Sequence, residues 1–247
     1  MILILLLAVA APINPLQSAF LASHRDYSAQ LVDKFAETTA DPAVIGQPFK
    51  FLGPLHNGQA LGGQPGPWYA YNDGKLQFVF TLSQKHVDPG FLGPKYIVGI
   101  IGGSRKSTRS YIGSNAYGAT ARIQVEKLEQ NGLVFLDGPS GERSPFGVPG
   151  VPDLRPPPDS YSAEFIFPGP QARKIALDAG LLIEGTIALL PNAKLSMCKG
   201  IYGGPEIDHP LEVYGSECWV GARVSRIAFV RRSTGEVLKE WMVARSE

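Results

Sequence analysis

The sequence has few features that mark a particular class of protein, and what it lacks narrows the choice. It has only two cysteines, Cys198 and Cys218, among 247 residues, and its formal net charge is +1. This balance of charge gives no electrostatic reason to expect a nucleic-acid partner. The apolar run over residues 2–11 is about 10 residues long, too short for a helix that spans a bilayer. We therefore expect no membrane span in the mature chain.

Short catalytic and nucleotide-binding motifs are also absent. Lys106-Ser107 is preceded by Arg105, where a phosphate-binding P-loop needs glycine, and adjacent Gly102 and Gly103 do not fit G-x-G-x-x-G. The two glycines instead predict a β-bulge or a turn with positive φ. G-x-S-x-G, H-E-x-x-H and the EF-hand loop are missing as well. We predict no cofactor, and a non-catalytic binding or structural module is the favoured interpretation.

The N-terminus is typical of an export signal. Residues 2–11 resemble the apolar region of a signal peptide, and Ala8-Val9-Ala10 has the small-x-small pattern of a cleavage site. A second cut after Ala19 stays open. Because no Lys or Arg precedes the apolar run, the alternative is a buried N-terminal strand. We expect residues 1–19 to be a signal peptide or apolar leader, and the protein to be exported, either periplasmic or extracellular.

Export and the cysteine pair are linked predictions. In an oxidising compartment, Cys198 and Cys218 are expected to form one disulfide that closes a loop of about 20 residues. In a reducing compartment the same residues would be two buried thiols.

The composition predicts a mainly β fold, α+β in the broad sense. Glycine occurs 28 times and proline 21 times, which favours many turns and short strands. Apolar residues spaced by three and four predict one amphipathic helix over about residues 20–38, with Ser18 as its cap. The rest should form an antiparallel β-sandwich or barrel. We expect residues 20–247 to be a single domain, with a Pro/Gly-rich loop over about 137–160.

Several local patterns predict particular strands. Asp73-Gly74 lies between aromatic-rich arms and predicts a hairpin, and residues 233–235 predict another near the C-terminus. Asn131-Gly132 is expected to turn the chain between two strands. Apolar residues at odd positions over 173–190 favour two strands that meet around residues 178–180, rather than one helix.

Basic and aromatic residues provide the first candidate site. The segment 95–127 has a local excess of Lys and Arg, among them Arg105, Lys106 and Arg109, that could bind an anionic polysaccharide or a lipid headgroup. Trp68 is the ring of the first hairpin expected at the surface, where it could stack on a sugar. The alternatives are a solvated basic turn and an aromatic core.

The segment between the cysteines provides the second candidate site. Glu206, Asp208, His209 and Glu212 offer oxygen ligands and one imidazole, which could hold Ca²⁺ or Zn²⁺. Their spacing matches no metal motif, and an ordinary acidic surface loop is the alternative.

The third candidate site is formed by His86 and Asp88. They lie at a turn directly after a strand and could act as an acid/base pair. A hydrolase whose site is assembled from distant segments, metal-assisted or not, is therefore the second functional hypothesis. A protein that docks in an assembly is the third. The partner would be an envelope glycan or another envelope protein.

Overall fold

The computed structural model describes residues 14–20, 42–58, 66–86, 95–114, 118–136, 160–190, 194–206 and 210–243. Within them, 11 strands join in one mixed sheet, which confirms the mainly β fold. Helical structure is confined to residues 15–20, η1 (Pro42–Val44) and α2 (Gly169–Asp178) in that part of the chain. The strands are β1 (Pro48–Pro54), β2 (His56–Asn57), β3 (Trp68–Asn72), β4 (Lys75–His86), β5 (Lys95–Ser114), β6 (Thr120–Phe135), β7 (Ser160–Ile166), β8 (Ala179–Ile187), β9 (Ser196–Gly203), β10 (Leu211–Arg231) and β11 (Val237–Met242).

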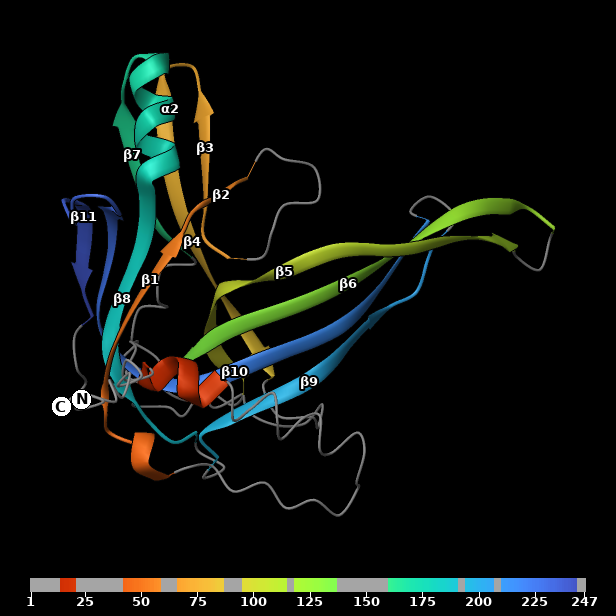
Figure 1. The fold of residues 1–247 in the computed structure, drawn as a ribbon, viewed down its shortest axis with the longest axis horizontal. Helices are drawn as coiled ribbons and strands as arrows, with labels where there is room; N and C mark the ends of the chain where they lie inside the picture. Colours follow the sequence, from red (N-terminus) through yellow and green to blue (C-terminus); the bar gives the residue numbers. More distant parts are fainter. Residues whose placement is uncertain are drawn as a thin grey trace, which may run out of the picture.

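The body of the protein has two layers of strands, in the manner of a sandwich (Figure 1). One layer contains β3, the first part of β4 and β7, and the other contains β1, β8, the second half of β10 and β11. The rings of Phe78 on β4 and Phe229 on β10 meet between the layers, with their centroids 5.5 Å apart. Most strand pairs are antiparallel as expected, but β6–β10 and β2–β3 are parallel.

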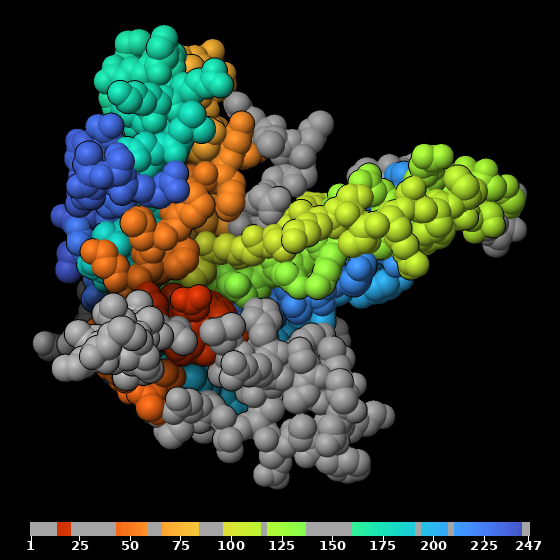
Figure 2. All heavy atoms as spheres, in the orientation of Figure 1, coloured from red at the N-terminus to blue at the C-terminus, as the bar shows by residue number. Residues whose placement is uncertain are grey.

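A long arm leaves the body and extends to one side (Figures 1 and 2). It consists of β5, β6, β9 and the first half of β10, and its strand order is β5-β6-β10-β9. β10 belongs to both parts: it pairs with β6 as far as Ala222 and with β8 from Ala222 onward. A register shift between Val224 and Arg226 accompanies this change of partner, as is typical of a bulge where a strand bends.

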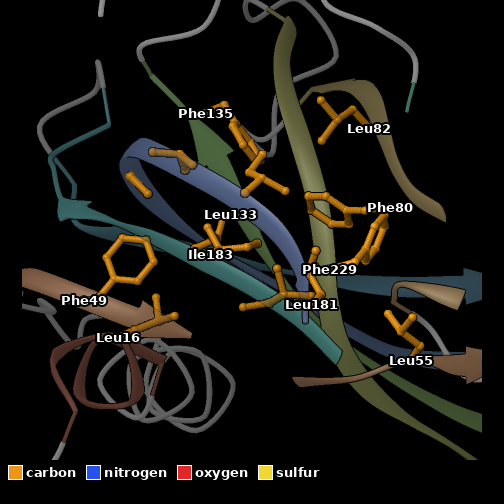
Figure 3. Packing of buried hydrophobic residues seen from close by; sticks show 14 of the residues in the cluster. Leu16, Phe49, Leu55, Phe80, Leu82, Leu133, Phe135, Leu181, Ile183 and Phe229 are labelled. Carbon is orange, nitrogen blue, oxygen red and sulfur yellow. The ribbon is translucent and has the colours of Figure 1, made fainter. Parts of the chain in front are cut away.

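The main hydrophobic core lies between the two layers and at the base of the arm (Figure 3). Phe80 and Leu133 are fully buried there, together with Leu181 and Ile183 of β8. Full burial of such side chains contributes roughly 1.5–3 kcal/mol each. The core therefore holds the root of the arm against the body.

The N-terminal helical segment also belongs to this core. Leu16 and Ala19 are buried, and the Leu16 amide donates to Asn14 Oδ1 at 3.0 Å. Asn14 thus caps a helix that begins at residue 15, so the prediction of Ser18 as the cap is wrong. The remainder of the expected helix over 20–38, and the Pro/Gly-rich loop apart from Ser160, lie outside the described residues.

Both predicted hairpins are confirmed. Asp73 (φ 49°) and Gly74 (φ 79°) form the β3–β4 turn, and Gly235 (φ 75°) lies between β10 and β11. The predicted bulge at Gly102-Gly103 is confirmed too, because the β5–β6 register shifts between Ile100 and Gly102.

Two other local predictions are wrong, the second only in part. The chain does not turn at Asn131-Gly132, because β6 runs straight through it. A Cβ at residue 132 would overlap the ring of Trp219, so this glycine makes room for a neighbouring side chain instead. Of the two strands predicted within 173–190, the second is present as β8, but the helix α2 takes the place of the first. α2 has a proline in its first turn and buries Ala172, Ile175 and Ala176 at helical spacing.

No helix among the described residues has the length and the apolar character that crossing a membrane would require.

Candidate binding surface on the arm

One face of the arm carries a row of four side chains in register across its four strands. Lys106 on β5 pairs with Lys127 on β6, Lys127 with Tyr214 on β10, and Tyr214 with Tyr202 on β9. Directly paired residues project from the same side of a sheet. The row therefore presents two ammonium groups beside two phenol rings, and Tyr202 is 74% exposed.

Arg109 and Tyr111 extend this face towards the tip of the arm. They pair with Val125 and Ile123 of β6, which are buried although they lie far from the body. We call Lys106, Arg109, Tyr111, Lys127, Tyr202 and Tyr214 together the tyrosine face.

Tyr111 is held in place from the other side of β6. Its hydroxyl donates a hydrogen bond of 2.8 Å to Glu212 Oε2, across the strand that carries Val125. This hydrogen bond, with a smaller contribution from the nearby carboxylate charge, raises the pKa of Tyr111. The phenol is therefore a fixed, neutral donor at ordinary pH.

The cations of the face differ in their partners. Lys127 forms an ion pair of 2.6 Å with Glu129, and this hydrogen bond raises the pKa of Lys127. Glu129 also accepts a hydrogen bond of 3.3 Å from Ser104 Oγ. Among the residues that the structure describes, neither Lys106 nor Arg109 forms an ion pair with a carboxylate. These two cations are the ones available to an anionic ligand.

The predicted ligand-binding residues thus separate into three groups. Lys106 and Arg109 come together on the tyrosine face. Arg105 projects from the opposite face, where its Nε forms a 2.5 Å ion pair with Glu126. Trp68 lies in the body on β3, is half-buried, and leaves no space for a Cβ at Gly58. The predicted basic segment is therefore divided between two faces and is neutralised in part.

The acidic segment lies at the end of the arm. Glu206 lines a small cavity of about 270 Å³ between the β5–β6 tip and the start of β10, and Glu212 is the acceptor for Tyr111. Asp208 and His209 lie outside the described residues. Within the described ranges, no three His, Cys, Asp or Glu side chains are grouped so as to hold a metal ion. The calcium or zinc site stays a prediction.

The proposed acid/base pair is likewise untested. His86 is the last residue of β4, its side chain is not described, and Asp88 lies outside the described residues.

The predicted cysteine pair is present as a disulfide. Cys198 on β9 and Cys218 on β10 are directly opposite each other, with their Cα atoms 4.1 Å apart. The bond lies on the tyrosine face, nearer the body than the row of lysines and tyrosines. It ties β9, the strand that carries Tyr202, to the centre of the arm, and it indicates an oxidising, non-cytoplasmic location.

Sequence reasoning missed the three tyrosines. Tyr111, Tyr202 and Tyr214 lie in separate segments, and no motif links them. Only the alternation within each strand could have indicated exposed rings. Their common face depends on the parallel β6–β10 register, which joins residues about 90 apart in the chain.

Comparison with known proteins adds no further information. No protein-family model matches the chain, and neither a curated protein nor a solved structure is detectably similar to it.

Proposed function

We propose that this protein is an exported, non-catalytic binding module that holds an acidic glycan of the cell envelope or the extracellular space along its tyrosine face. The observation that carries the proposal is the row Lys106–Lys127–Tyr214–Tyr202, with Arg109 beside it.

The chemistry of the face suits a polymer of acidic sugars. The C–H face of a pyranose ring packs on a phenol ring, which offers a rigid apolar surface with a polar edge. A sugar carboxylate accepts charge-assisted hydrogen bonds from ammonium and guanidinium groups. Cations and phenol rings side by side on one face therefore match a chain in which each sugar ring carries a carboxylate.

The shape of the arm supports the same ligand class. A projecting sheet exposes a long, open surface (Figure 2), and an extended polymer can contact such a surface over several residues. A small substrate, in contrast, is normally enclosed by a pocket.

Export is the other part of the proposal. The disulfide between Cys198 and Cys218 supports an oxidising compartment, and the apolar leader with its small-x-small pattern supports secretion as the route to it.

The test is binding of polygalacturonate, a polymer of a uronic acid, with neutral dextran as the comparison. Arg109→Gln and Arg105→Gln make the same change on the same strand, but they act on opposite faces. We expect Arg109→Gln to weaken polygalacturonate binding about fivefold, which corresponds to about 1 kcal/mol, and Arg105→Gln to change it less than twofold. Equal effects of the two variants, equal binding of dextran, or no binding of polygalacturonate would each overturn the proposal.

A further inference from the structure

A groove in the body, between α2 and β3, forms a second place where a ligand could bind. Its volume is about 490 Å³, within the usual range of small-molecule sites. Figure 1 shows α2 and β3 side by side at the end of the body away from the N-terminal helical segment. The groove shares no residue with the tyrosine face of the arm. Its lining consists of Asn57, Tyr69, Tyr71, Gly169, Ala172, Arg173, Ala176 and Leu177.

The groove has room because three of the α2 residues that line it are glycine or alanine. Gly169, Ala172 and Ala176 follow one another at spacings of three and four, which places them on one face of the helix. Ala172 and Ala176 are buried, so they form the floor. Any longer side chain at these positions would occupy the space.

Two aromatic rings form the opposite wall. Tyr69 and Tyr71 alternate on β3, so they project from the same side, and both pack against the main core. The hydroxyl of Tyr71 donates to the carbonyl oxygen of Phe167 at 3.2 Å. This contact fixes the ring in place before any ligand arrives, and a flat ligand could lie on a wall prepared in this way.

The polar groups of the lining carry one sign of charge. Arg173 contributes a guanidinium and Asn57 an amide, and none of the described residues that line the groove is Asp or Glu. A guanidinium at the edge of an aromatic wall favours a planar anion that can accept two hydrogen bonds, and a carboxylate is such a group.

We infer that this groove binds a compact ligand with one six-membered ring and one carboxylate. The ring lies between the Ala172–Ala176 floor and the two tyrosines, and the carboxylate meets Arg173. An aromatic acid and a free hexuronic acid share this chemistry, and the experiment below separates them.

The experiment is calorimetric titration of the full-length, oxidised protein with benzoate, glucuronate and benzyl alcohol. Benzoate and glucuronate have the ring and the carboxylate, whereas benzyl alcohol has an aromatic ring without the charge. We expect at least one of the two acids to bind with a Kd of about 1 mM or tighter, and benzyl alcohol to bind at least fivefold more weakly. The acid that binds more tightly shows whether the ligand is an aromatic acid or a hexuronic acid.

Arg173→Gln and Lys174→Gln are matched variants, because each removes one exposed positive charge from α2 and only Arg173 lines the groove. Arg173→Gln should weaken binding of the acid at least fivefold, and Lys174→Gln should leave it unchanged. Failure of both acids to bind, equal binding of benzyl alcohol, or equal effects of the two variants would overturn the inference. Arg109→Gln on the arm should not affect this titration, so its outcome is independent of the proposed glycan site.

Discussion

The hydroxyl of Tyr111 on β5 donates a 2.8 Å hydrogen bond to Glu212 on β10, although 101 residues separate them in the chain. The contact crosses β6 and covers Val125, which is only 1% exposed. A hydrophobic residue is thus buried far out on the arm, where no second layer of the body reaches. This hydrogen bond links the Tyr111 ring on the outer part of the tyrosine face to β10.

Tyr202 is the most exposed tyrosine of this face, and therefore the one most accessible to a ligand. It is 74% exposed, so its removal should cost the folded protein little. We expect Tyr202→Ala to weaken polygalacturonate binding about fivefold, or about 1 kcal/mol, with no change in the midpoint of urea unfolding. Tyr202→Phe keeps the ring and should bind like the unaltered protein. If Tyr202→Phe loses as much affinity as Tyr202→Ala, the hydroxyl rather than the ring makes the contact.

Asp178 is expected to make the stability depend on pH. This last residue of α2 accepts hydrogen bonds from Ser233 Oγ at 2.6 Å and from Ser233 N at 3.0 Å, and it pairs with Arg231. The Ser233 hydroxyl first, and then the Ser233 amide and Arg231, lower the pKa of Asp178 despite some opposing desolvation. A carboxyl with a lowered pKa stabilises the folded state above its unfolded pKa of about 3.9, and this contribution is lost as the pH falls through the folded pKa.

Asp178→Asn should therefore be less stable than the unaltered protein at about pH 7, and the difference should shrink as the pH falls below about 4. Urea unfolding across this range measures it. Asp73→Asn is the control, because Asp73 lies in an exposed turn with a positive φ that asparagine tolerates. A pH-independent difference for Asp178→Asn would show that the carboxylate charge does not contribute.

Gly132 gives a prediction about packing. A methyl group there would overlap the ring of Trp219, which is almost fully buried. Gly132→Ala should lower the free energy of unfolding by about 1–3 kcal/mol, the usual cost of overpacking. Gly102→Ala on the adjacent strand is the control, since a Cβ at that position meets nothing within 4 Å. Similar losses in both variants would point to backbone conformation in place of the tryptophan contact.

Gly132 also illustrates how far the fold could be predicted from the sequence. Asn-Gly favours a two-residue turn when nothing else acts on it. Here the segment stays in a strand, because Gly132 packs against Trp219. The turns at Asp73-Gly74 and Gly235 were predictable, because their positive φ values are a local requirement. The odd-numbered apolar pattern over 173–190 correctly predicted the strand β8 but was misleading over 173–178. There Leu177 is exposed and the buried residues of α2 follow helical spacing.

The candidate site was predictable only in part for a related reason. Lys106 and Arg109 were identified by charge within one segment. Their assembly with Tyr202 and Tyr214 depends on how β6 and β10 pair, and local patterns contain no information on that register.

The disulfide is expected to stabilise the whole protein. It joins residues 20 apart in the chain, and a loop of this size corresponds to about 3 kcal/mol in the chain-entropy account. The double variant Cys198→Ala/Cys218→Ala should lose about that much in urea unfolding, and a reductant should bring the unaltered protein to the same value. The reductant should have no effect on the double variant. If the double variant is as stable as the oxidised protein, the bond contributes nothing to folding.

The packing of the N-terminal helical segment gives a prediction about where the proposed leader would be cut. Leu16 and Ala19 are 3% and 0% exposed in the core, and Asn14 Nδ2 donates to the carbonyl oxygen of Lys50 on β1 at 3.0 Å. A cut after Ala19 would remove all three contacts, whereas a cut after Ala10 would keep them. If the protein is exported as proposed, we expect its mature form to begin at Ala11, as N-terminal sequencing or intact mass can determine. A chain that starts at Phe20 should be less stable than one that starts at Ala11 by about 2 kcal/mol or more, because burial of Leu16 is lost. A mature protein that begins at Phe20 and is as stable as the longer chain would contradict this prediction. The segment before Phe20 would then contribute nothing to folding.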